Sequence, residues 1–298
     1  MGEAALQITG LEPGIYEGIP DKEYHLLEYK GSSPLKKFHN QPSSIFEPTE
    51  VTEDMELGSA QHAFSLQGPE VFHSQFVVGL NRGNRSADDK KAHAEFTLEH
   101  LGKTVLPATV TTKKIPTLQA IIDVDNFLFR EHPLSKIIMR TGSSELAVIW
   151  DDEATGYRCK ARLDRYPDPD KRMIVDLKKC ARIDKFPWQM RELKYTIQSG
   201  HYTNGVNVHD HLADAFTFIA FNFGNPPGIR IITLTGDYLQ KQCNLAKTTL
   251  RLLKECEEAG VYPKYPIPLE TESMASILGI KSPISKQLSP WDYLEVME

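Results

Sequence analysis

The chain has 298 residues, of which 40% are hydrophobic and 25% charged, so it is long enough to bury a substantial core. No apolar run approaches the roughly 18 residues that span a bilayer, and the N-terminus lacks the basic and apolar regions of a secretory signal. The cysteines form no C-x-x-C pair, which disfavours a zinc or redox site and favours free thiols (Cys159, Cys180, Cys243 and Cys256). We therefore expect a soluble cytoplasmic protein with no membrane partner.

The net charge of −6 conceals a basic segment in the middle of the chain. From Arg158 to Lys194 there are twelve Lys and Arg residues against six Asp and Glu residues, which makes this segment net +6. One interpretation is a solvated basic face, and the other is a phosphate-binding surface around an acidic metal site. The charge alone does not distinguish the two.

The first half of the chain has the patterns of helices joined by polar loops. Predicted helices cover 32–40, Thr52 or Asp54 to about 68, 87–101 and 117–131, and the second is followed by an exposed loop at 79–93. Ser32 or Ser33 is the expected N-cap of the first helix. His132–Pro133 ends the last one.

The second half changes to strand-like alternation. The predicted strands are 145–152, 156–167, 172–180, 214–223 and 229–237, with a turn at PDPDK (167–171). Helices are predicted at 187–204, starting at a proline, and at 238–259, ending at Gly260. Helices first, then the order β-β-β-α-β-β-α, indicate an α/β fold with a mixed central sheet flanked by helices and a helical N-terminal region. We expect an N-terminal extension (1–50), a core domain (51–260) and a Pro-rich tail (261–298).

Three residues in adjacent predicted strands form a chemical constellation. Asp164 stands near the end of one strand, and Asp176 and Lys178 stand two apart on the next, so these two side chains share a face. A connection of about a dozen residues would bring the two acids together, where they repel each other unless a cation lies between them. Oxygen ligands favour Mg²⁺, for which Mn²⁺ can substitute, and a neighbouring lysine can orient a water or stabilise charge on a phosphate.

The same residues resemble a known signature. Asp164 followed by Asp176-Leu177-Lys178 resembles the PD-(D/E)XK nuclease motif. MELGSAQHAFSL resembles the G-x-x-x-H helix of the RecB-like branch of that superfamily, with His62 in the metal-ligand position. Gln198 and Tyr202, four apart on one helix face, resemble its Q-x-x-x-Y motif. Segments such as GIYEGIPDKEYH and TGYRCKARLDRY resemble RecE-type exonucleases (exonuclease VIII), over about residues 13–268.

The resemblance implies a restriction-endonuclease-like core and a role for each matching residue. The expected ligands of one or two Mg²⁺ ions are His62, Asp164, Asp176 and the backbone carbonyl of Leu177. Lys178 orients or deprotonates a water, and Gln198 and Tyr202 position the scissile strand or the lysine. Glu145 is either a supporting acid or a plain strand-edge residue. The candidate phosphate contacts are Lys160, Arg162 and Arg165.

A RecE-type enzyme degrades one strand of linear double-stranded DNA from a free end, and the expected direction is 5′ to 3′. Its partners would be DNA, a single-strand annealing recombinase and further copies of itself in a ring, in a bacterial or phage-infected cell. Three alternatives stay open on the sequence. They are a structure-selective endonuclease of the same fold, a DNA-binding module without catalysis, and a structural or interaction protein.

Overall fold

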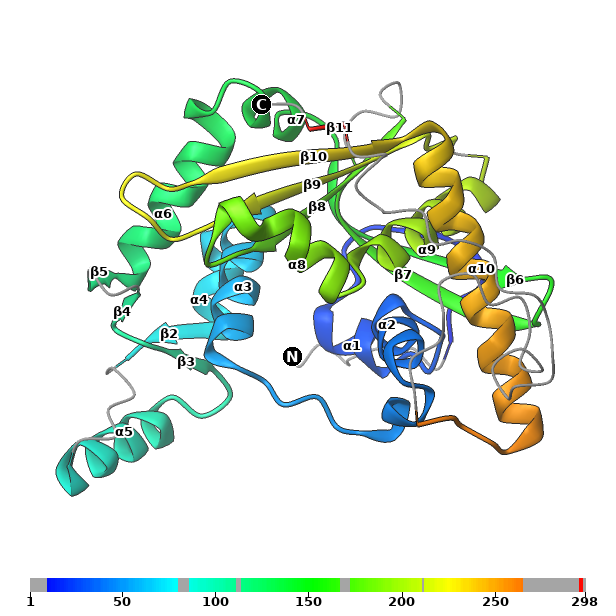
Figure 1. Ribbon diagram of the computed structural model, residues 1–298. Coiled ribbons are helices and arrows are strands. Elements are labelled where there is room, and N and C mark those ends of the chain that lie inside the picture. Colours follow the sequence, from blue (N-terminus) through cyan, green and yellow to red (C-terminus); the bar gives the residue numbers. More distant parts are fainter. Residues whose placement is uncertain are drawn as a thin grey trace, which may run out of the picture.

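The computed structural model describes residues 10–79, 86–110, 114–166, 172–210 and 212–264, and the backbone of 295–296. Within these ranges the centre is a seven-stranded sheet in the order β1-β6-β7-β8-β9-β10-β11 (Figure 1). The strands are β1 (Gly14–Tyr16), β6 (Ser143–Asp152), β7 (Tyr157–Tyr166), β8 (Met173–Lys179), β9 (Ala215–Phe221), β10 (Ile229–Thr235) and β11 (Glu295–Val296). The β8–β9 pair is parallel and the other neighbours are antiparallel, so the predicted mixed sheet is confirmed.

Helices cover both faces of the sheet because its central strands are apolar on both sides. On β9, Phe216 and Phe218 belong to one core cluster, and Ile219 and Phe221 belong to another. The first cluster is closed by α2 (Ser32–Asn40), α8 (Phe186–Glu192), α9 (Tyr195–Val208) and α10 (Gly236–Ala259). The second is closed by α3 (Glu53–His62), α4 (Pro69–Gln75) and α6 (Thr117–Asn126). Figure 1 shows these groups apart, with α3, α4 and α6 on the left and α2, α9 and α10 on the right.

Smaller elements complete the described part. They are α1 (Asp21–Leu26), α5 (Ala87–Glu99), α7 (Ser135–Met139), the parallel pair β2 (Phe76–Val78) and β3 (Thr104–Leu106), and the antiparallel pair β4 (Thr109–Val110) and β5 (Ile115–Pro116). Single 3-10 turns lie at Pro42–Phe46 and Ile183–Lys185, and π-helical turns lie at Ala63–Gln67 and Phe127–Glu131. No helix in the described ranges is both long enough and apolar enough to cross a membrane.

Most of the predicted elements are confirmed, with boundaries displaced by a few residues. Thr52 caps α3 as expected, since its hydroxyl accepts a hydrogen bond from the Met55 N–H at 3.3 Å. The serine cap predicted for α2 is wrong, because Gly31 occupies the N-cap position and no side chain caps the helix. The predicted PDPDK turn, the first part of the 79–93 loop and nearly all of the 261–298 tail lie outside the described residues.

The hydrophobic core is continuous across the predicted domain boundary at residue 50. Leu35 and Phe38, on α2, are fully buried in the same cluster as the central strands. The helix packs against α9 and α10. The N-terminal extension therefore contributes to the core it was expected to pack against, and the domain limits stay predictions.

The single helix predicted over 187–204 is wrong. The chain forms α8, then a break at Leu193–Lys194, then α9. Lys194 adopts a left-handed conformation with φ of +53°, which a right-handed helix cannot accommodate. The sequence gives no warning, because the break contains neither glycine nor proline. It sets the direction of α9, which carries Gln198 and Tyr202.

Strands β7 and β8 separate soon after they meet. Their register within the described residues consists of Arg165 opposite Val175. Beyond that pair, within the described residues, the edge of β8 that faces β7 has no backbone register with β7, and a buried N–H there needs a side-chain acceptor. The opening between these two strands is where the acidic residues gather.

Helix α9 is held close to α10 by a glycine. A Cβ at Gly200 would overlap the carbonyl oxygen of Gln242 and lie 2.7 Å from the Cys243 nitrogen. Gly58, in α3, has space by contrast, since its nearest neighbour would be the Lys179 Cβ at 3.7 Å. Only a residue without a side chain lets the two helix backbones approach this closely at Gly200.

We expect Gly200→Ala to lower the free energy of unfolding by about 3 kcal/mol, the upper end of overpacking costs, because a backbone atom cannot rotate away. Gly58→Ala is the matched control and should leave stability unchanged or raise it by about 0.5–1 kcal/mol through helix propensity. Urea denaturation followed by circular dichroism measures both. Equal stability of the two variants would contradict the proposed close contact.

Candidate active site

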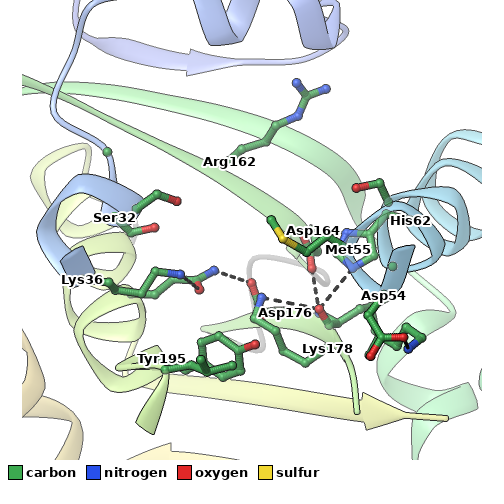
Figure 2. Close-up of a pocket in the computed structure, with 18 of the residues that line it drawn as sticks. Ser32, Lys36, Asp54, Met55, His62, Arg162, Asp164, Asp176, Lys178 and Tyr195 are labelled. Atoms are coloured by element: carbon green, nitrogen blue, oxygen red, sulfur yellow. Dashed lines mark hydrogen bonds and ion pairs between the residues drawn. The ribbon is translucent and has the colours of Figure 1, made fainter. Parts of the chain in front are cut away.

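A cleft of about 1100 Å³ opens between the two groups of helices. Its walls come from α1, α2 and α3, from the facing strands β6, β7 and β8, and from α8 and α9. Figure 2 shows the side chains of α2, α3 and the strands pointing toward one another across it. All the predicted ligands and the predicted Lys178, Gln198 and Tyr202 line this cleft, so the fold brings them together from four separate parts of the chain.

Asp176 lies in the middle of β8 and is 1% exposed. Its Oδ1 accepts a hydrogen bond from Gln198 Nε2 at 2.6 Å, and its Oδ2 forms an ion pair with the Lys178 ammonium. Burial lowers the pKa of Lys178, but the carboxylates of Asp176 and Asp164 outweigh it and raise the pKa overall. The lysine is therefore a charged donor in this arrangement.

Asp164 projects from β7 into the gap beside β8. Its Oδ2 accepts the Leu177 N–H at 2.7 Å, which supplies the acceptor that the separated strand does not. Its Oδ1 lies 3.5 Å from His62 Nδ1. Burial, and then the charge of Asp176, raise the pKa of Asp164 because neither favours a second negative charge here.

Glu145 lies opposite Asp164 across the β6–β7 pair, since Ser144 faces Arg165 and Leu146 faces Leu163. Its φ of +55° is unusual for a residue in a strand that is not glycine. Its Oε2 accepts a hydrogen bond from Arg162 Nε at 2.6 Å, and burial followed by Asp164 raises its pKa. The structure therefore gives Glu145 a place inside the site rather than at a plain strand edge.

Three of these side chains fit a divalent cation. One ligand atom each from His62, Glu145 and Asp164 can be chosen so that all lie within 4.8 Å of one another. Carboxylate oxygens with one imidazole nitrogen suit Mg²⁺ or Mn²⁺. One oxygen of each carboxylate is held by a neighbour, Arg162 or the Leu177 N–H, so the other is free to face a cation.

The orientation of His62 supports the same fit. Its Nε2 lies 3.1 Å from the Leu177 carbonyl, which favours a proton on that nitrogen and leaves the lone pair of Nδ1 facing Asp164. Burial lowers the pKa of His62, so the ring is neutral. A neutral Nδ1 and a carboxylate oxygen 3.5 Å apart are two acceptors that need a cation or a proton between them.

Two of the four predicted ligands, Asp176 and the Leu177 carbonyl, already have partners within the protein. Both oxygens of Asp176 have partners, Gln198 and Lys178, and Asp176 is outside the group that fits a cation. The Leu177 carbonyl lies near His62 Nε2 and 3.5 Å from Lys178 Nζ. Their roles as ligands stay predictions, and a metal would have to draw them away from these partners.

Tyr202 lies one helical turn beyond Gln198 on α9 and is 9% exposed. Its hydroxyl hydrogen-bonds with Ser32 of α2. Burial, and then the charge of Asp176, raise its pKa to about 12, so it is a neutral phenol. The tyrosine thus connects α9 to α2 at the floor of the cleft.

The three predicted phosphate contacts have partners within the protein. The Lys160 ammonium donates to the carbonyl oxygens of Tyr24 (2.9 Å) and Leu27 (2.6 Å). Arg162 donates to Glu145, to Asp21 and to the Ile19 carbonyl. Arg165 donates to Ser144 at 2.7 Å and is not among the residues that line the cleft. Lys160 and Arg162 therefore hold α1 against the sheet, and DNA contact by any of the three stays a prediction.

The sequence patterns do not predict two residues that lie at the centre of the site. Lys36 reaches in from α2, and Tyr195, at the start of α9, lies beneath both Lys36 and Lys178. Neither belongs to a spaced motif with the acids. Lys36 is separated from Asp176 by 140 positions, so only the packing of α2 on α9 brings it close.

A mixed sheet with an aspartate on one strand, Asp-X-Lys on the next and helices on both faces defines the PD-(D/E)XK class of fold. A family model described as "PDDEXK-like domain of unknown function (DUF3799)" matches residues 33–270, and the chain belongs to this family. No curated protein sequence matches the chain.

One solved structure is similar over almost its whole length. It is the crystal structure of a "putative exonuclease" from Eubacterium rectale, with 16% sequence identity and a TM-score of 0.56. The similarity covers 92% of this chain and 97% of that one. At this identity the likeness concerns the fold alone, and the family match is what confirms the predicted PD-(D/E)XK-like core.

We expect Glu145→Gln to weaken binding of Mn²⁺ and Mg²⁺ about ten-fold or more, because it removes a charged oxygen from the group that fits the ion. Isothermal titration calorimetry of the metal alone measures the affinity. Glu153→Gln, an exposed change in the turn after β6, is the control and should bind as the wild type does. Wild-type affinity in Glu145→Gln would remove Glu145 from the metal site.

A second expectation concerns stability in the absence of metal. The pKa of Asp164 in the folded protein is raised above the value of 3.8 expected in the unfolded chain. Its protonated form therefore contributes stability that is fully present below pH 3.8 and is lost as the pH rises through the folded-state pKa. In EDTA, Asp164→Asn should therefore gain stability relative to the wild type between pH 5 and pH 8. Urea denaturation of both proteins at pH 5 and at pH 8 measures the difference in their free energies of unfolding. An equal difference at the two pH values would contradict the expectation.

Proposed function

We propose that this protein is a metal-dependent DNA exonuclease that degrades one strand of linear double-stranded DNA, in the 5′ to 3′ direction. Membership of a PD-(D/E)XK-like family supports nuclease chemistry. The observation that carries the proposal is the single cleft in which a cation-binding group (His62, Glu145 and Asp164) adjoins the paired Asp176 and Lys178. A module that only bound DNA would gain nothing from three neighbouring acids, two of them buried, that repel one another.

A bound Mg²⁺ would supply Lewis-acid chemistry, polarising a phosphate oxygen and lowering the pKa of a water. The other contributions come from the protein. Lys178, as a charged ammonium, donates to the attacking water or to a non-bridging oxygen and stabilises negative charge that develops on the phosphate. Asp176 holds that ammonium in place, and Gln198 holds Asp176. Cleavage adds water across a phosphodiester bond, and the leaving oxygen takes up a proton.

The polarity and the biological setting are part of the same proposal and rest on the resemblance to RecE-type enzymes. The substrate is a duplex with a free end, and the single strand that remains is passed to an annealing recombinase. Further copies of the chain would assemble into a ring around DNA. A cytoplasmic location in a bacterial or phage-infected cell is consistent with a nuclease that acts on DNA.

We expect Lys178→Ala and Asp176→Asn each to reduce Mg²⁺-dependent cleavage of linear duplex DNA by at least about a hundred-fold, because the first removes the ammonium that acts at the phosphate and the second removes the carboxylate charge that holds the ammonium in place. Lys247→Ala is the control, since Lys247 is exposed on α10 away from the cleft. Cleavage is followed on gels, and circular dichroism verifies folding. Full activity in both site variants would reject the assignment of the site.

The form of the substrate separates exonuclease from endonuclease. Duplexes labelled at the 5′ or the 3′ end, and a covalently closed circle of the same sequence, are incubated with Mg²⁺ or EDTA. Early release of the 5′ label with an intact circle supports the proposal. Cutting of the circle would instead indicate an endonuclease of the same fold, and early release of the 3′ label would reverse the direction.

A further inference from the structure

Lys36 is a cation without an acidic partner in the described residues around it. It enters the cleft from α2, beside Asp176 and Lys178 (Figure 2). Its ammonium lies 3.5 Å from the amide oxygen of Gln198 and 5.3 Å from the centre of the Tyr195 ring. Both neighbours are neutral, so the charge of Lys36 is not balanced by a carboxylate of its own.

The surroundings of Lys36 disfavour the positive charge on its ammonium group. Burial, and then repulsion by Lys178, lower the pKa of Lys36 to about 8. The Lys178 ammonium lies 5.1 Å from the centre of the same Tyr195 ring, so both cations contact one aromatic side chain. Lys37, the next residue, has no such surroundings, because it turns away and donates to the Glu47 carbonyl at 2.6 Å. Two like charges converging on one cleft favour an anion between or beside them.

Gln198 connects Lys36 to the acidic side of the site. Its amide NH₂ donates to Asp176, and its amide oxygen accepts from Lys36. A glutamine can do both because it carries a donor and an acceptor at one end, which a glutamate cannot. Figure 2 shows Lys36 on one side of Asp176 and His62 on the other, so the cation without an acidic partner lies away from the cation-binding group.

We propose that Lys36 binds a phosphate of the DNA strand being cut, next to the phosphate that is hydrolysed. This inference rests on the proposed nuclease function and adds a substrate-binding residue to it. The scissile phosphate belongs at the metal group and Lys178, so the phosphate that follows along the strand meets Lys36. The ammonium donates to its non-bridging oxygens, and the negative charge offsets the repulsion between the two lysines.

The contact can be measured through salt dependence. The full chain is assayed with Mg²⁺ on linear duplex DNA over a series of salt concentrations, comparing the wild type with Lys36→Gln, Lys36→Arg and the control Lys37→Gln. Each lost phosphate contact makes the slope of log(kcat/KM) against log[salt] shallower by about 0.7–0.9. We expect that change in Lys36→Gln, with a KM raised about ten-fold and kcat little changed.

Lys36→Arg should keep the wild-type slope, since a guanidinium also binds phosphate, and Lys37→Gln should change neither slope nor KM. A wild-type slope in Lys36→Gln overturns the inference. A lower kcat with unchanged slope and KM also overturns it, because Lys36 would then act through Gln198 alone. If Lys36→Gln does not fold, a Lys36→Arg variant with a shallower slope and raised KM contradicts the proposal. A wild type that does not cleave DNA removes the proposed function together with this inference, whereas cleavage with no effect at Lys36 removes the inference alone.

Discussion

The repulsion among three carboxylates gathered in one cleft, two of them buried, is the constraint on which the site depends. Glu145, Asp164 and Asp176 come from three neighbouring strands, and each is held by a different group. Arg162 neutralises Glu145, the Leu177 N–H binds Asp164, and Lys178 with Gln198 holds Asp176. Asp164 is the acid without a lysine or arginine bonded to it in the described residues, and it faces His62. A divalent cation would relieve the strain where the protein does not.

The backbone is arranged around this requirement. Because β8 separates from β7, the Leu177 N–H is available to donate a hydrogen bond to the Asp164 carboxylate. Glu145, with its positive φ, lies at the position opposite Asp164. The break at Lys194 then directs α9 so that Gln198 reaches Asp176. Residues in sparsely populated conformations concentrate at functional sites because the surrounding structure can hold them there. Two of the non-glycine residues with positive φ in the described part of the chain, Glu145 and Lys194, thus help to shape the cleft.

The cleft brings an acidic group and two lysines together. His62, Glu145 and Asp164 form the first, and Lys178 and Lys36 approach Asp176 and Gln198 beside it. A phosphodiester carries negative charge and accepts hydrogen bonds on its oxygens, so it can bridge a metal and an ammonium at the same time. Lys160 and Arg162, the predicted phosphate contacts, bond to α1 and Glu145 within the protein, and their contact with DNA stays a prediction.

The sequence by itself determined the elements whose signal is local. Alternating strands around Asp164 and Asp176, the capped helix that carries His62, and the spacing of Gln198 and Tyr202 were all legible, because side-chain periodicity follows from backbone geometry. The tertiary structure alone decided what depends on contacts between distant segments. It placed Lys36 beside Asp176, brought Glu145 next to His62 and Asp164 in a geometry that fits a cation, and broke the predicted long helix at Lys194. These outcomes follow from packing and charge across the cleft, which no pattern of neighbouring residues records.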